Sequence, residues 1–122
     1  MEFAFLMFTA LAFAALLQTA PGATGPVANL MAYEDVVRCA GLSQAASELE
    51  GAESEAGSKL FDAALYWSLA ASQAAQAAGR DPVAADRDQT LARIEAVRRL
   101  TIHDAEAATL LQRCRQRTPD LG

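Results

Sequence analysis

The sequence contains little of the residue chemistry on which enzymes and metal proteins depend. Its 122 residues include one histidine, His103, and two cysteines, Cys39 and Cys114. A histidine-based metal site needs a second histidine, and any nucleophile and base pair would depend on His103, beside a helix-capping sequence where surface histidines are common. The C-x-x-C, C-x-x-C-H and G-x-S-x-G motifs and phosphate-binding glycine loops are missing. We therefore expect a protein that is not an enzyme and carries no metal or cofactor.

The sequence also lacks any stretch in which β-branched and polar residues alternate, so it predicts no strands. Hydrophobic residues make up 52% of the chain, but many of them are alanine. Alanine buries little apolar area, so we expect an all-α domain with a thin core that depends on close helix packing.

The sequence has fewer basic than acidic residues, which gives a net charge of −5 and a pI of 4.7. Nucleic-acid binding needs clustered lysine and arginine, so we do not expect nucleic acid as a partner. The acidic residues from Glu48 to Glu55 lack the spacing of a calcium loop and predict a solvated turn.

The longest apolar run, from Phe3 to Leu17, is followed by a turn-forming stretch of small residues at 20–26. This layout predicts a signal peptide over residues 1–22, cleaved after Gly22, and a protein that is periplasmic or secreted. The alternative is an uncleaved anchor over residues 3–20, because Glu2 stands where a basic residue is usual. The membrane would then be contacted only through this segment.

Behind a linker at residues 23–29, the sequence predicts a helical domain at 30–118 and a tail at 119–122. We expect four helices in a small up-down bundle. The first runs from Leu30 to Leu49 with Asn29 as a candidate cap, and the second from Lys59 to Ala78. The third begins at Pro82 after an Asp81 cap, and the fourth at Ile102, with Thr101 and Asp104 resembling a capping box.

The third and fourth helices each carry a stripe that we expect to face the core. The stripe of the third helix follows three- and four-residue steps, with one arginine at its edge. Its members are Val83, Arg87, Leu91, Ile94 and Val97. The stripe of the fourth helix consists of Ala107, Leu110, Leu111 and Cys114.

The two cysteines are expected to form a disulfide between the first and last helices. Exported proteins usually have bonded cysteines, and Cys39 and Cys114 both fall on faces predicted to be buried. A redox-active pair is the alternative, but the C-x-x-C spacing that lowers a thiol pKa is missing. We therefore interpret the pair as a structural bond.

Three aromatic residues, Phe61, Tyr66 and Trp67, lie on the most apolar predicted helix. We expect them to anchor one end of the core. The alternative is that they contact a ligand or a partner protein.

The leading functional hypothesis is a protein-interaction module of the bacterial envelope, since no catalytic group is apparent. The bacterial assignment rests on alanine and arginine usage that resembles small exported proteins of GC-rich proteobacteria. One alternative is an acid- or stress-responsive periplasmic chaperone of the holdase type, because acid would leave the arginines after residue 80 unbalanced. Another is a small-ligand carrier with a cavity beside Trp67.

Overall fold

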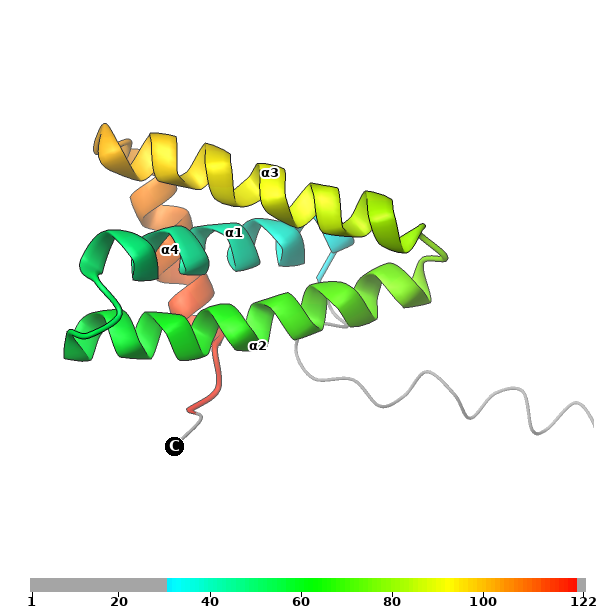
Figure 1. Ribbon diagram of the computed structural model, residues 1–122, viewed down its shortest axis with the longest axis horizontal. Coiled ribbons are helices and arrows are strands. Elements are labelled where there is room, and N and C mark those ends of the chain that lie inside the picture. Colours follow the sequence, from blue (N-terminus) through cyan, green and yellow to red (C-terminus); the bar gives the residue numbers. More distant parts are fainter. Residues whose placement is uncertain (1–30, 121–122) are drawn as a thin grey trace, which may run out of the picture.

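The structure is a computed structural model that describes residues 31–120 and contains four helices (Figure 1). They are α1 (Tyr33–Glu50), α2 (Glu55–Ala77), α3 (Pro82–Thr101) and α4 (Ala105–Arg117). Within the described range the all-α prediction is confirmed. The predicted signal peptide or anchor and the linker lie outside the described residues.

Helix α1 lies between α2 and α3 and makes its most extensive contacts with them. The first three helices run up and down, whereas α4 crosses them instead of continuing this order (Figure 1). It also contacts α1, the neighbour that the sequence predicts. The predicted up-down arrangement is therefore present for α1, α2 and α3. It is wrong for α4, which lies across them.

In the first half of the chain, both α1 and α2 begin at other residues than predicted. The N-cap of α1 is Ala32, which has no capping side chain, so the favourable end charges come from Glu34 and Asp35. Helix α2 begins at Glu55, four residues before the predicted Lys59. Ser54 caps it by accepting a hydrogen bond of 2.9 Å from the Gly57 backbone, so part of the predicted acidic loop is helical.

In the second half, one predicted start is confirmed and the other is wrong. Asp81 caps α3 by accepting a 3.0 Å bond from the Ala84 backbone, and Pro82 follows it as predicted. Helix α4 begins after Asp104, not at Ile102, because α3 continues to Thr101. The Thr101 hydroxyl donates to the Val97 carbonyl of its own helix, at 2.6 Å, instead of capping α4.

The core is thin, as its composition predicts. Its largest fully buried side chains are Trp67, Val36 and Ser43, and most of its other members are alanines. Helices α1 and α2 contribute most of the core, whereas α3 contributes only Ala85 and Ala96, with Ala92, Val97 and Leu100 packed beside it.

The predicted core stripe of α3 is wrong for Val83, Leu91 and Ile94, which are more than half exposed. The reason is the close approach of α3 to α1 at Gly41. A Cβ atom added to Gly41 would lie 2.6 Å from the carbonyl carbon of Ala92. Only small residues fit such a contact, so α3 turns its alanine face inward and its larger side chains outward.

Candidate functional site

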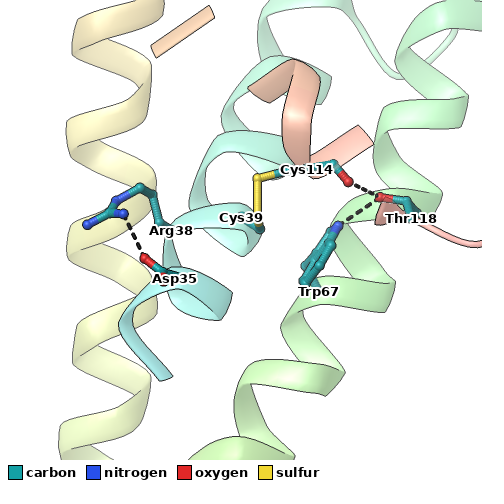
Figure 2. Close-up of a disulfide and its surroundings, with 6 residues drawn as sticks. All are labelled: Asp35, Arg38, Cys39, Trp67, Cys114 and Thr118. Atoms are coloured by element: carbon teal, nitrogen blue, oxygen red, sulfur yellow. Dashed lines mark hydrogen bonds and ion pairs between the residues drawn. A yellow bond between two sulfur atoms is a disulfide. The ribbon is translucent and has the colours of Figure 1, made fainter. Parts of the chain in front are cut away.

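The two cysteines meet where α4 crosses α1 (Figure 2). Their sulfur atoms are 2.06 Å apart and their Cα atoms 5.5 Å apart, as in a disulfide bond. Cys39 lies in the middle of α1 and Cys114 in the last turn of α4, an offset that the crossing of the helices accommodates. The pairing expected from the sequence is therefore present, and both residues are buried.

Trp67 packs next to this junction and is fully buried (Figure 2). Its indole Nε1–H donates a hydrogen bond of 2.8 Å to Oγ1 of Thr118, immediately after α4. The Thr118 hydroxyl in turn donates to the backbone carbonyl of Cys114, also at 2.8 Å. The indole, the threonine and the disulfide thus form one structural unit that ties α2 to the end of α4.

The other two predicted aromatic residues are placed differently. The Tyr66 ring packs edge-on against Trp67, with centroids 5.1 Å apart and planes at 84°. Phe61 is 50% exposed, so the expectation that it anchors the core is wrong. Of the three aromatic candidates, Phe61 is the one whose ring is open to a partner.

A shallow groove of about 210 Å³ runs beside the disulfide and has an excess of positive charge. Its lining consists of Met31, Asp35, Arg38, Cys39, Leu110, Arg113, Cys114 and Arg117. The Arg38 guanidinium donates to Asp35 at 2.9 Å, so one of its three arginines is neutralised within α1 (Figure 2). Arg117 lies in the last turn of α4, near the negative end of the helix dipole, which explains its position without a ligand.

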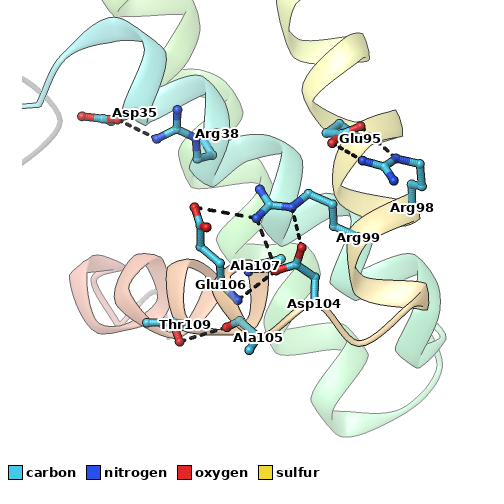
Figure 3. A network of polar contacts seen from close by, with 10 residues as sticks. All are labelled: Asp35, Arg38, Glu95, Arg98, Arg99, Asp104, Ala105, Glu106, Ala107 and Thr109. Carbon is cyan, nitrogen blue, oxygen red and sulfur yellow. Dashed lines mark hydrogen bonds and ion pairs between the residues drawn. The ribbon is translucent and has the colours of Figure 1, made fainter.

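A polar network joins the end of α3 to the start of α4 (Figure 3). The Asp104 carboxylate accepts backbone hydrogen bonds from Ala107 and Glu106, at 3.1 Å and 2.9 Å, and forms an ion pair with Arg99. These bonds stabilise the charged carboxylate, so they lower the pKa of Asp104. His103, the lone histidine, is exposed in the turn with a φ of 59°. It is a turn residue here.

A second polar cluster joins the starts of α1 and α3. Arg80 forms a bidentate contact with Asp88, and the Tyr33 hydroxyl donates to the same carboxylate at 2.8 Å. The Arg80 guanidinium also lies 5.9 Å from the centre of the Tyr33 ring. The arginine and the hydroxyl lower the pKa of Asp88, while burial and the neighbouring carboxylate raise the pKa of Tyr33. We therefore interpret the cluster as a structural contact that holds the start of α1 against α3.

Large apolar side chains also lie on the outer surface, where the periodicity of the sequence does not predict them. Phe61, Leu65 and Leu69 follow four-residue steps along α2, with 50% to 66% of each residue exposed. On α3 and at its C-terminal cap, four similar residues are 53% to 69% exposed, and they are Val83, Leu91, Ile94 and the cap residue Ile102. Each set occupies the side of its helix that faces away from α1. These two faces are the surface features that sequence reasoning missed.

Among residues 31–120, no group of His, Cys, Asp and Glu side chains is arranged to hold a metal ion. No helix in this range has the length and apolar character to cross a membrane. No family model, curated protein or solved structure matches the chain.

Proposed function

We propose that the chain is an exported, non-enzymatic interaction protein of the bacterial envelope that binds a partner protein through the outer face of α2. The observation that carries the proposal is the row formed by Phe61, Leu65 and Leu69. These side chains are one helical turn apart and together form a continuous apolar stripe. An amphipathic helix or an apolar loop of the partner would bury this stripe.

Two features of the helix make the stripe suited to docking rather than to internal packing. The opposite face of α2 already contributes Trp67 and a series of alanines to the core, so the helix is held in place without the stripe. Serine, glutamine and Asp62 surround the stripe, as polar residues surround the apolar centre of a protein interface.

Export is supported by the disulfide, because such bonds persist in oxidising compartments. Intact-mass analysis of the protein purified from the native host tests this part. We expect a mass that corresponds to cleavage after Gly22 and is about 2 Da below that of the dithiol form. The full-length mass would contradict cleavage, and recovery from the cytoplasm with free thiols would contradict export.

Site-specific photocrosslinking in the native host tests the docking face. A photoreactive residue at Leu69 is expected to yield a crosslink to one other protein, and the same residue at the exposed Gln112 of α4 to yield none. A Leu65→Lys substitution should abolish the Leu69 crosslink without changing the circular dichroism, because Leu65 is half exposed. Equal crosslinking from both positions, or persistence with Leu65→Lys, would refute the proposed face.

The structure gives less support to the two alternatives. A ligand carrier would need a cavity beside Trp67, but this side chain is fully buried and its nitrogen is already hydrogen-bonded. The holdase hypothesis depends on acid opening the helices. Binding of a hydrophobic dye that rises between about pH 7 and pH 2 would favour it, since acid-opened states expose apolar surface.

A further inference from the structure

The groove beside the disulfide has a positive charge that its own carboxylate does not balance. Arg38 and Asp35 of α1 form an ion pair at 2.9 Å, so their charges cancel. Arg113 and Arg117 of α4 line the same groove, and neither has a hydrogen bond or an ion pair with another side chain among residues 31–120. Three arginines and one aspartate therefore give the groove a net charge of +2. The protein as a whole has a net charge of −5.

The helix that carries these two arginines explains only one of them. Arg117 lies in the last turn of α4, where the helix dipole favours a cation, but Arg113 lies one turn earlier. Like charges four residues apart lie on the same side of a helix and repel each other. A bound anion would remove this repulsion and accept hydrogen bonds from both guanidinium groups.

We propose that this groove binds the phosphate group of a small phosphate monoester. Guanidinium groups bind phosphate through paired hydrogen bonds. A phosphate monoester carries a charge of about −1.5 to −2 at pH 7, so it matches the net charge of the groove. A single carboxylate matches only half of this charge. The site lies between α1 and α4, whereas the proposed partner-binding face lies on the outer side of α2, so the two are independent.

The size and the remaining lining of the groove limit the rest of the ligand. The volume of about 210 Å³ is below the roughly 300–1,000 Å³ of pockets for drug-sized ligands. Met31, Leu110 and the disulfide supply the apolar part of the lining. A small apolar substituent on the phosphate would pack against them. The ligand is therefore a phosphate with a short organic group rather than a long polymer.

The unbalanced charge distinguishes this groove from a larger one of about 550 Å³ between the start of α2 and the end of α4. The larger groove contains equal numbers of basic and acidic side chains. They are Lys59, Arg115, Asp62 and Asp120. A dianion would be repelled there by two carboxylates as well as attracted by two cations. We therefore expect binding beside the disulfide and not in the larger groove.

Isothermal titration calorimetry with phenyl phosphate, in a phosphate-free buffer, tests the site on the protein purified from the native host. We expect saturable binding with a dissociation constant of about 1 mM or lower. Benzoate has the same ring but a single charge, and it should bind roughly tenfold more weakly. Vesicles that contain phosphatidic acid distinguish a lipid phosphate from a soluble one. Vesicle binding that phenyl phosphate displaces would assign the phosphate to a lipid, and binding of phenyl phosphate alone would assign it to a soluble ester.

Matched double substitutions test whether the groove is responsible. Arg113→Gln/Arg117→Gln should weaken phenyl phosphate binding at least roughly tenfold. The control Arg87→Gln/Arg115→Gln removes the same charge outside the groove and should bind as the wild type does. All four arginines are exposed, so both variants should keep the wild-type circular dichroism. The proposal would be overturned by a wild type without saturable binding, by an equal loss in the control, or by benzoate binding as tight as that of phenyl phosphate.

Discussion

Reduction of the disulfide should release α4 from the other helices. Only Ala107 and Cys114 of this helix are buried, and its remaining apolar contacts come from the partly buried Leu110 and Leu111. The bond joins residues 75 positions apart. The loop-entropy relation gives a stabilisation of about 4.5 kcal/mol for a loop of this length. That is about 30% or more of the roughly 5–15 kcal/mol of total stability of a typical domain.

The single tryptophan provides a local readout of this release. When α4 detaches, Trp67 loses its hydrogen bond to Thr118 and is exposed to water. We expect dithiothreitol to shift the Trp67 fluorescence to longer wavelength. The urea midpoint should fall by about 2 M, which is 4.5 kcal/mol divided by a typical slope of about 2 kcal/mol per M.

The appropriate control is the Cys39→Ala/Cys114→Ala variant, which should resemble the reduced protein and show no response to dithiothreitol. If reduced and oxidised protein unfold at the same urea concentration, the bond does not hold α4 in place. If the midpoint falls but the fluorescence of folded, reduced protein stays that of the buried indole, α4 remains docked and the reasoning about Trp67 is refuted.

Two further predictions concern packing in α1 and the cap of α4. Gly41→Ala should destabilise the protein by about 1–3 kcal/mol in urea unfolding, because its Cβ would press on the Ala92 backbone. The matched Ser43→Ala should stabilise it by about 1 kcal/mol, since the buried Ser43 hydroxyl has no partner within residues 31–120; equal effects would refute the packing argument. The lowered pKa of Asp104 means that its contribution is present above its ordinary value of 3.8 and is lost as the pH falls through the lowered value. When acid unfolding is followed by circular dichroism, the loss of stability below about pH 4 should therefore be less steep for Asp104→Asn than for the wild type. Identical unfolding curves would contradict the stabilising role of the Asp104 carboxylate.

The elements that local chemistry specifies were predictable. Asp81 followed by Pro82 marks the start of α3, and the structure has both in the expected capping positions. The cysteines were predictable as a pair because each follows the apolar periodicity of its helix. The start of α4 was not, because Thr101 and Asp104 both resemble caps and only the observed hydrogen bonds distinguish them.

The candidate surfaces were harder to predict. Periodicity identifies Val83, Leu91 and Ile94 as one face of a helix but does not say which way the face points. The usual assumption that large apolar residues are buried fails here because α1 offers Gly41 as its contact with α3. Phe61 illustrates the same point on α2, where the fully buried Trp67 and small residues fill the core instead.

The sequence by itself determined the helical class, the start of α3 and the pairing of Cys39 with Cys114, since these depend on local composition, capping and periodicity. The tertiary structure decided which face of each helix is buried and that α4 crosses the others. The physical reason is that burial depends on how closely two helices approach. This distance is set jointly by residues distant in sequence, such as Gly41 and Ala92, and no local pattern contains it.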